Sequence, residues 1–414
     1  MTVSPQDPER VLKIRWVTWS PLPYWTDRFN ALADYPGVEL EVVVMRASET
    51  SYAFTIDPST WRFRSRVLSS RPGGVGFGRA SLLPRTLQSL TSGPITTRLV
   101  MPYADGTFLL AAMSSRLRGM PYSLFAASTA DDSRSGARVF EITKRWMFKN
   151  AERFLATGPL QAAYVRNYDP DARISIIGNP IDVYRFATMD PDVTGRRERL
   201  RAERGWSDRF VVGYVGRLSP EKDLPTLVRA AALLAKDNLP VTIAVAGSGR
   251  MEGSLRKLSA ELDTDVRFLG FLDGIELGDL YRSVDVFCLP SVSEPWGLVV
   301  NEAMAMGLPV VVSNRVGSRT LLEDGKSGLI FPAGDVPALA ERLTGLARSV
   351  EFRRRLGAAA LKSIQAHTIG AWTRAVVAAL ADGYGRPQSL ESGQRIGPAA
   401  APKSLGGPEG ADER

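Results

Sequence analysis

Apolar residues along this chain fall into two series, in which short apolar runs alternate with longer stretches of helical periodicity. In the first series, residues 12–18 and 39–45 read as strands, and residues 27–33 predict a helix between them. This β-α-β opening is typical of a parallel sheet. The series continues with strands predicted at 97–101, 122–126, 153–156 and 173–177 and with helices predicted at 107–118 and 137–150.

A second series of the same kind begins at residue 210. The alternation again predicts a parallel sheet covered by helices. A chain of 414 residues is too long to fold around one ordinary hydrophobic core. The two series therefore predict an α/β protein of two domains. The second series comprises strands predicted at 210–215, 241–246, 266–269, 285–289, 309–312 and 328–331 and helices predicted at 223–236, 251–262, 276–283, 298–306, 317–323, 335–348 and 350–384.

Composition marks the predicted boundaries between these parts. The Asn-Pro turn at 179–180 and the charged stretch that follows indicate a connection between domains. After residue 385 the chain is rich in Gly, Pro, Ser and Ala and has few large apolar residues. Such a segment cannot bury enough apolar surface to offset the conformational entropy lost on folding. The predicted division is a flexible start at 1–11, an N-terminal domain at 12–189, a linker at 190–209, a C-terminal domain at 210–367 and a disordered tail at 386–414.

Two acidic residues in the second half, Glu294 and Glu302, bracket a Pro-Trp-Gly turn and the start of a predicted helix that ends near Gly307. A helix start offers unpaired N–H groups and the positive end of the helix dipole, which suits phosphate. Carboxylates accept hydrogen bonds from hydroxyls, which suits sugars. The alternative is an ordinary capping acid followed by a solvent-facing helix residue.

Two basic residues, Arg217 and Lys222, flank the turn that follows the predicted strand at 210–215. Open α/β sheets bind ligands at the carboxyl ends of their strands. Arg217 as a fork and Lys222 as a point charge suit a diphosphate. The alternative is that Lys222 pairs with Glu221 or Asp223 on a solvated turn.

The reactive side chains are few. The single cysteine, Cys288, lies inside an apolar strand-like run, which excludes an intramolecular disulfide and indicates core packing in a reducing cytoplasm. The single histidine, His367, leaves no room for histidine triads or histidine-rich metal sites. Residues 1–10 are polar and do not resemble a signal peptide, and no apolar run is long enough to span a bilayer.

The net charge of +8 concentrates in residues 58–104, which hold seven arginines and no Asp, Glu or Lys. Apolar residues interleave with these arginines, a pattern that favours an anionic membrane surface or an anionic acceptor. The alternative is a solvated face of an arginine-rich protein. A nucleic-acid-binding protein is a further alternative, but the window has no helix-turn-helix, zinc or RNA-binding signature, so no nucleic acid is expected.

Several motifs in the second half, taken together in this order and spacing, resemble the donor half of glycosyltransferase family 4. The resemblance is strong over about 208–345, and Gly-Asn-Pro-Ile-Asp at 178–182 resembles the segment before the domain crossover in such enzymes. The motifs are Gly-Arg-Leu-Ser-Pro-Glu-Lys at 216–222, Val-Ala-Gly-Ser-Gly at 245–249, Val-Arg-Phe-Leu-Gly at 266–270, Tyr-Arg-Ser-Val-Asp-Val-Phe-Cys-Leu-Pro-Ser at 281–291 and the pair of glutamates that follows.

The resemblance implies the GT-B fold, in which two Rossmann-like domains face a central cleft and the last helix, here 368–384, returns to the N-terminal domain. It also implies transfer of a sugar from a nucleotide sugar with retention of configuration, without a metal or a separate cofactor. Glu294, Arg217 and Lys222 are the implied catalytic residues. The implied donor-binding residues are Gly216, Gly270, Phe271, Gly297, Leu298, Val299 and Glu302.

The N-terminal half departs from the family pattern. Many relatives carry a glycine pair after the first strand and a histidine after a middle strand, and this chain has neither. Tyr24 and Trp25 after the first strand, and Asp131 after a middle one, are the acceptor-side candidates. Asp131 and Asp132 are also candidates for capping a helix.

The acceptor is predicted to be lipid-linked or a small molecule, and the protein to be cytoplasmic, with peripheral contact to the inner membrane face through residues 58–104. Other activities on the same fold stay open. The alternatives are a nucleotide-sugar epimerase or a phosphorylase on the same fold, and a non-catalytic sugar-nucleotide-binding module.

Overall fold

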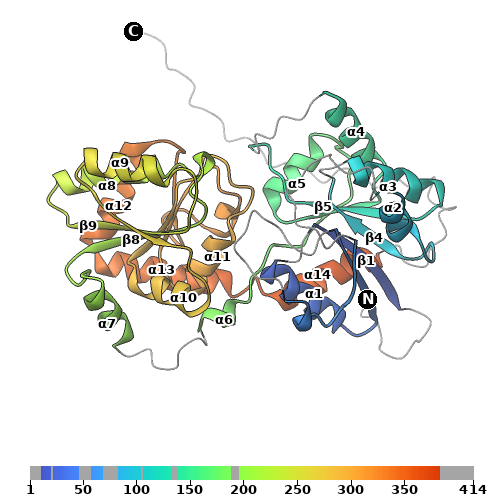
Figure 1. The fold of residues 1–414 in the computed structure, drawn as a ribbon, viewed down its shortest axis with the longest axis horizontal. Helices are drawn as coiled ribbons and strands as arrows, with labels where there is room; N and C mark the ends of the chain where they lie inside the picture. Colours follow the sequence, from blue (N-terminus) through green and yellow to red (C-terminus); the bar gives the residue numbers. More distant parts are fainter. Residues whose placement is uncertain are drawn as a thin grey trace, which may run out of the picture.

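The computed structural model describes residues 11–19, 22–45, 57–68, 83–103, 106–131, 138–187 and 195–382. These residues form two α/β halves that lie side by side, each with helices packed around a sheet (Figure 1). The strand order is β3-β2-β1-β4-β5-β6-β7 in the first sheet and β10-β9-β8-β11-β12-β13 in the second. The described strand pairs run parallel, as the alternation of strands and helices predicts.

The N-terminal sheet is built around β1, where Trp16 lies opposite Val42 of one neighbour and Val100 of the other. All three side chains are buried, because a strand flanked on both sides and covered by helices has no face in water. The elements of this half are β1 Leu12–Thr18, α1 Pro23–Ala33, β2 Val38–Val44, η1 Pro58–Thr60, β3 Arg64–Val67, α2 Leu83–Thr91, β4 Arg98–Met101, α3 Gly106–Leu117, β5 Tyr122–Ala126, α4 Arg138–Lys149, β6 Arg153–Ala156, α5 Pro159–Arg166, β7 Ile174–Ile176 and α6 Val183–Ala187.

The C-terminal sheet repeats the scheme around β8, which pairs with β9 and β11. The buried Cys288 lies on β11, where burial raises the pKa of its thiol, so it packs in the core as its apolar surroundings in the sequence predict. The elements of this half are α7 Arg196–Glu203, β8 Phe210–Val215, η3 Pro220–Lys222, α8 Leu224–Lys236, β9 Val241–Ala246, α9 Glu252–Glu261, β10 Asp265–Gly270, α10 Gly274–Ser283, β11 Val286–Leu289, α11 Leu298–Ala305, β12 Val310–Ser313, η4 Gly317–Leu321, β13 Leu329–Phe331, α12 Val336–Arg348, α13 Val350–Ile364 and α14 Ile369–Ala381.

The helical pattern predicted over 350–384 forms two helices, α13 and α14, and the second of them matches the last helix expected at 368–384. Thr368 begins the second helix by accepting a hydrogen bond from the backbone N–H of Ala371, a side-chain cap that ends one helix pattern and starts another. The helix predicted at 27–33 begins earlier, at Pro23, and the one predicted at 317–323 is the short 3-10 helix η4.

Helix α14 belongs spatially to the N-terminal half, although it ends the described chain. It lies beside α1 (Figure 1), and Trp372 meets Trp16 with ring centroids 5.8 Å apart. Burying large aromatic rings against one another removes much apolar surface from water, which holds this last helix on the first sheet. The residues from 383 onward, including all of the predicted tail at 386–414, lie outside the described part.

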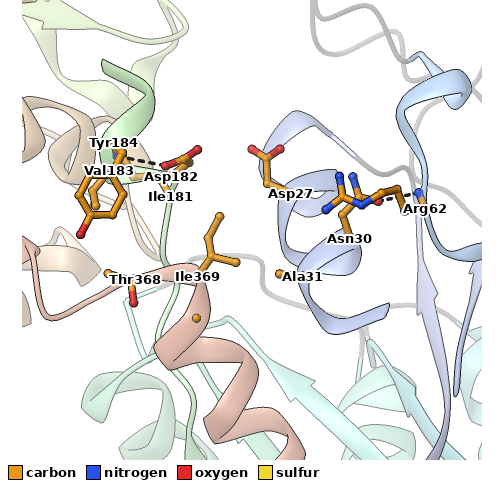
Figure 2. A pocket seen from close by; sticks show the side chains of 11 residues that line it. Asp27, Asn30, Ala31, Arg62, Ile181, Asp182, Val183, Tyr184, Thr368 and Ile369 are labelled. Carbon is orange, nitrogen blue, oxygen red and sulfur yellow. Dashed lines mark hydrogen bonds between the residues drawn. The ribbon is translucent and has the colours of Figure 1, made fainter. Parts of the chain in front are cut away.

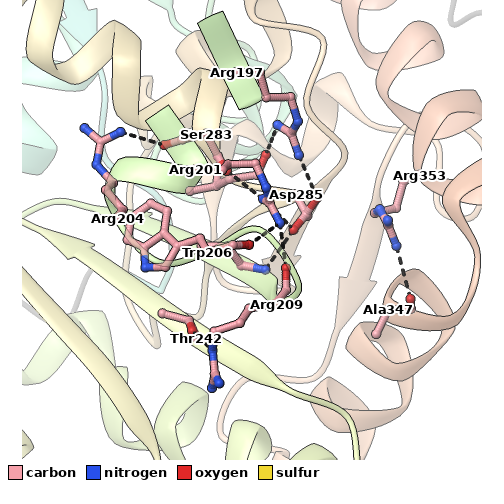
Figure 3. A network of polar contacts seen from close by, with 12 residues as sticks. Arg197, Arg201, Arg204, Trp206, Arg209, Thr242, Ser283, Asp285, Ala347 and Arg353 are labelled. Atoms are coloured by element: carbon pink, nitrogen blue, oxygen red, sulfur yellow. Dashed lines mark hydrogen bonds and ion pairs between the residues drawn. The ribbon is translucent and has the colours of Figure 1, made fainter. Parts of the chain in front are cut away.

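Residues 196–203 of the predicted linker form helix α7. Arginines of this helix bind the C-terminal half through ion pairs and hydrogen bonds (Figure 3). Arg197 and Arg201 each pair with Asp285, at 2.7 and 3.0 Å. Asp285 also accepts a 2.8 Å hydrogen bond from the N–H of Val211. The helix therefore docks through charge and backbone contacts rather than through an apolar stripe.

A cavity of about 390 Å³ lies where the chain crosses between the two halves (Figure 2). Asp27 of α1 and Asp182 before α6 lie on opposite sides of the cavity. Thr368, at the start of α14, also lines it, where the chain returns to the N-terminal half. Burial raises the pKa of the Asp27 carboxyl above its usual value. Of the described helices, none is long and apolar enough to cross a membrane.

Candidate functional site

Several of the predicted site residues gather in loops at the carboxyl ends of β8 and β11. The two loops are hydrogen-bonded to each other, because the N–H of Val292 donates to the carbonyl of Glu221 at 2.9 Å. A third loop joins them after β12, where the N–H of Gly317 donates to the carbonyl of Glu294 at 2.8 Å. Parallel strands bring their carboxyl ends to one edge of the sheet, so residues far apart in sequence meet there.

Lys222 and Glu294 form an ion pair across this loop cluster. Their side chains are only 13% and 14% exposed, so the pair is shielded from water. The alternative in which Lys222 pairs with an acid of its own turn is wrong. Glu221 accepts instead from the hydroxyl of Ser219, and Asp223 from that of Thr226.

Arg217 lies on the same loop but is more open to solvent. Its side chain is 53% exposed and lies 3.6 Å from Glu221. The hydroxyl of Tyr214 donates to the carbonyl of Arg217 at 2.8 Å and fixes the loop backbone. Burial, followed by the nearby Glu294 and Glu221, raises the pKa of Tyr214 well above its ordinary value, so this hydroxyl stays protonated and keeps donating.

Gly297 sets the start of helix α11. Its φ of +88° lies in the left-handed region, which glycine adopts without steric cost. A Cβ there would lie 2.9 Å from Leu289 and 3.2 Å from Glu294, so a larger residue would push the turn away. Leu298 and Val299 form the first turn of α11, whose helix lies on the side of the C-terminal half that faces the N-terminal half (Figure 1).

Glu302 lies one turn further along α11 and is fully buried, at 0% exposure. Its carboxylate accepts one hydrogen bond from the hydroxyl of Tyr281 at 2.7 Å and another from Tyr24 of the N-terminal half. The alternative of a solvent-facing helix residue is therefore wrong. Burial raises the pKa of the Glu302 carboxyl, although the hydrogen bonds from the two tyrosines act in the opposite direction.

Gly270 and Phe271 follow β10 at the same edge of the sheet. The N–H of Gly247 donates to the carbonyl of Gly270 at 2.6 Å, which ties the loop after β10 to the loop after β9. Gly216 joins this set through its own N–H, which donates to Ala246 at 3.0 Å. Phe271 is 41% exposed and therefore is not a core residue.

Of the acceptor-side candidates, Tyr24 and Asp131 reach the C-terminal half and Trp25 does not. Asp131 pairs with Arg315 across the two halves, and its carbonyl accepts from the hydroxyl of Ser293 at 3.1 Å. Trp25 instead stacks on Phe29 with centroids 5.1 Å apart, inside the aromatic cluster of the N-terminal half. Asp132 lies outside the described residues.

Comparison with known proteins identifies the C-terminal half. Residues 196–363 match the family model described as glycosyl transferases group 1. The chain is 31% identical over 252 residues to a D-inositol 3-phosphate glycosyltransferase of Kribbella flavida, covering 58% of each chain. It is 32% identical over 253 residues to an alpha-D-kanosaminyltransferase of Streptomyces kanamyceticus, covering 59% of this chain and 66% of that one.

The C-terminal half of this chain is therefore similar to the glycosyl transferases group 1 family over residues 196–363. The family predicted from the motifs is thereby confirmed over this region. The chain spans less than two thirds of the length of either curated relative.

Solved structures extend the likeness to the whole fold of this chain. HepE of Anabaena, solved in complex with UDP, superposes with a TM-score of 0.71 at 18% identity, covering 90% of this chain and 100% of that one. Sucrose-phosphate synthase of Thermosynechococcus elongatus superposes with a TM-score of 0.69 at 20% identity, covering 88% and 97%. The predicted GT-B fold, with two parallel-sheet α/β domains, is confirmed.

The sequence did not indicate two residues near the candidate site that form hydrogen bonds across the two halves. Gln161 of α5 donates to the carbonyl of Pro295 at 2.6 Å, which holds the turn after Glu294. Asn301 of α11 donates to the carbonyl of Asn179 at 3.1 Å. Each contact joins segments more than a hundred residues apart, and no local pattern in either segment indicates its partner.

No group of three His, Cys, Asp or Glu side chains with the arrangement of a metal site occurs among the described residues. Asp265, one of the two acids near 263–265, pairs with Arg209 and Arg267 at 3.3 and 2.6 Å. That pairing is a local loop feature at the start of β10, at the opposite end of the strand from Gly270.

Proposed function

We propose that this chain is a glycosyltransferase that moves a sugar from a nucleotide-diphosphate sugar to an acceptor, with retention of configuration. The observation that carries the proposal is the shielded Lys222–Glu294 pair at the carboxyl ends of β8 and β11, beside the start of α11. It places a cation, a carboxylate and a helix start at one point of the family's donor half.

The diphosphate of the donor lies, in this proposal, between the loop after β8 and the start of α11. Arg217 and Lys222 supply positive charge, and the first N–H groups of α11, at Leu298 and Val299, add the positive end of the helix dipole. Charge placed where the leaving group becomes more negative lowers the barrier to its departure.

Glu294 has two roles in this scheme. It orients Lys222 in the absence of substrate, and when phosphate oxygens take over the ammonium group, its carboxylate becomes available to a hydroxyl of the donor sugar. The bond between the anomeric carbon and the diphosphate oxygen breaks, and the diphosphate leaves with the electron pair. The acceptor oxygen forms the new bond on the same face and gives its proton to the departing phosphate.

The donor is bounded by the remaining predicted residues. Gly216, Gly270 and Phe271 lie at the strand ends where the nucleoside part would extend, and Glu302 would accept hydrogen bonds from the ribose hydroxyls. HepE, which shares the fold, was solved with UDP and with UDP-glucose. That likeness supports a nucleotide sugar as the donor class for this chain.

We propose that the acceptor is a lipid-linked or small molecule. The protein would meet this acceptor in the cytoplasm, at the inner face of a membrane. Strand β3 at the edge of the N-terminal sheet is exposed along its length and carries Arg64 and Arg66. Arg66 pairs with Glu41 and Arg62 with Asp34, so part of the basic charge is already balanced. Residues 69–82 of the basic window lie outside the described part.

The test is product formation by variants of the ion pair. Lys222→Ala and Glu294→Ala are each expected to lower transfer by about 100-fold or more, as removal of a charge-stabilising group does in other active sites. Mass analysis of products, with nucleoside diphosphate release measured in parallel, reports transfer and separates it from epimerisation and phosphorolysis.

The matched control is Arg256→Ala, which breaks an exposed ion pair with Glu252 on α9, outside the site. It is expected to leave transfer unchanged. Folded Lys222→Ala and Glu294→Ala proteins with wild-type turnover would reject the proposal.

A further inference from the structure

A residue from the N-terminal half, Tyr24, covers the carboxylate of Glu302 and donates a hydrogen bond to it. Tyr24 of α1 donates its hydroxyl to one oxygen, and Tyr281 of α10 donates to the other at 2.7 Å. Glu302 has no exposed surface in this arrangement. The two hydroxyls thus occupy a carboxylate that the family motif assigns to binding hydroxyls.

The two tyrosines differ in where they are anchored. Tyr281 belongs to the same half as Glu302, is almost fully buried and lies 3.5 Å from the carbonyl of Val299. Tyr24 comes from the first helix of the N-terminal half and packs its ring against the core of the C-terminal half. Tyr281 is therefore a fixed part of the site, whereas Tyr24 leaves it whenever the two halves separate.

The position of Tyr24 is held by its own helix. Arg28, one turn later, is buried and donates to the carbonyl of Pro180 at 3.0 Å, in the segment that crosses between the halves. Its guanidinium also lies 4.9 Å from the ring centre of Trp25, which is packed in the aromatic cluster. The start of α1 is thus fixed relative to the crossing, and the Tyr24 hydroxyl is aimed at α11.

A buried carboxylate without donors is costly, so each oxygen of Glu302 needs a partner in every state of the protein. Burial raises the pKa of Tyr24 well above its ordinary value, which keeps the hydroxyl protonated and able to donate. A ribose offers hydroxyl donors of the same kind. A ribose hydroxyl and the Tyr24 hydroxyl therefore meet the same need at the same carboxylate.

We propose that Tyr24 occupies the ribose position on Glu302 when no donor is bound, and that its displacement sets the affinity and ribose dependence of the nucleotide site. The inference rests on the proposed function, in which Glu302 accepts from the ribose. Donor binding then exchanges one hydroxyl for another at the oxygen that faces Tyr24, while Tyr281 keeps its own hydrogen bond. Tyr24 is a specificity-determining residue from the acceptor half, not a catalytic one.

The exchange links nucleotide binding to the contact between the halves. Tyr24 is carried by α1, whose half also holds Asp131 on Arg315 and Gln161 on Pro295. If Tyr24 must leave Glu302 before nucleotide binds, only the fraction of protein in which Tyr24 has left can bind. The apparent Kd is then the intrinsic Kd divided by that fraction.

The test is titration calorimetry with UDP, ADP and GDP on the full chain and on Tyr24→Phe, which keeps the ring and removes the hydroxyl. The nucleotide that binds the wild type is expected to bind Tyr24→Phe about threefold to tenfold more tightly, because the competing donor is gone. Inorganic pyrophosphate, which has no ribose, is expected to bind both proteins equally. Tyr281→Phe is expected to show no tightening.

Two further variants keep the outcome clear. Tyr24→Leu repeats the measurement if the phenylalanine protein is unstable, and Tyr184→Phe removes the hydroxyl of a tyrosine that is 63% exposed, with no expected change. Unchanged or weaker nucleotide binding by Tyr24→Phe, or equal tightening for pyrophosphate, overturns the role of Tyr24 while leaving the proposed function standing. A wild-type protein that binds none of the three nucleotides overturns both.

Discussion

At the scale of single residues, glycines allow the backbones of neighbouring site loops to lie in close contact. A Cβ on Gly317 would lie 1.9 Å from the carbonyl oxygen of Pro295, inside the turn that follows Glu294. A Cβ on Gly247 would lie 1.9 Å from the carbonyl oxygen of Gly216. Both contacts are with backbone, which cannot rotate away as a side chain can. The loops that carry Lys222 and Glu294 therefore require glycine at these approaches.

Gly317→Ala tests this requirement. The added methyl group must displace the Pro295 turn, so we expect a loss of about 1–3 kcal/mol in the free energy of unfolding. Because a displacement of about 1 Å costs on the order of 100-fold in rate, kcat/KM should fall by about that factor. Gly253→Ala on α9 is the control, since no atom lies within 4 Å of its Cβ position. Equal behaviour of the two variants in denaturant titration and in turnover would contradict the account.

Residue chemistry in the second half was predictable because ligand-binding groups follow strand ends. Arg217 and Lys222 follow β8, and Glu294 follows β11, so the sheet itself brings them together. The partner of Lys222 and the burial of Glu302 were not predictable. The pairing of Lys222 depends on loop packing, and the burial of Glu302 depends on the approach of Tyr24 from the other half. No spacing within either segment encodes these contacts.

At the scale of elements, buried strands were the most predictable parts. β1, β5, β6, β8 and β9 match the predicted ranges, because each is a short stretch dominated by buried apolar residues. Helix α7 was not predicted, because its sequence is almost entirely charged and has no apolar period. It is held instead by arginines that reach Asp285 and backbone carbonyls. Among these, Arg201 donates to Ser283 and Trp206, both at 2.8 Å.

Asp285→Ala tests how α7 is held. Two arginines that now share this carboxylate would be left without it in a mostly buried site, so we expect a loss of about 3 kcal/mol or more in the free energy of unfolding. Glu252→Ala, which breaks the exposed pair with Arg256, should cost less than about 1 kcal/mol. Urea titration of both variants provides the comparison. A similar, small loss in both would mean that the arginine network does not anchor the helix.

At the scale of the whole molecule, the two halves meet through a few specific polar contacts around the site. Tyr24 with Glu302, Gln161 with Pro295 and Asp131 with Arg315 each join one half to the other. Every one of these contacts reaches the part of the C-terminal half that carries Glu294 and Glu302, so a movement of the halves apart would break them. The sequence predicted two domains facing one cleft, but the contacts that close the cleft come only from the folded arrangement.

The most direct test of the central claim is a crystal structure of the protein with a bound nucleoside diphosphate. We expect the diphosphate to lie between Arg217, Lys222 and the first turn of α11, with the ribose on Glu302 and the Tyr24 hydroxyl moved off that carboxylate. A diphosphate bound elsewhere, with Lys222 still paired to Glu294 and no contact to the start of α11, would contradict it.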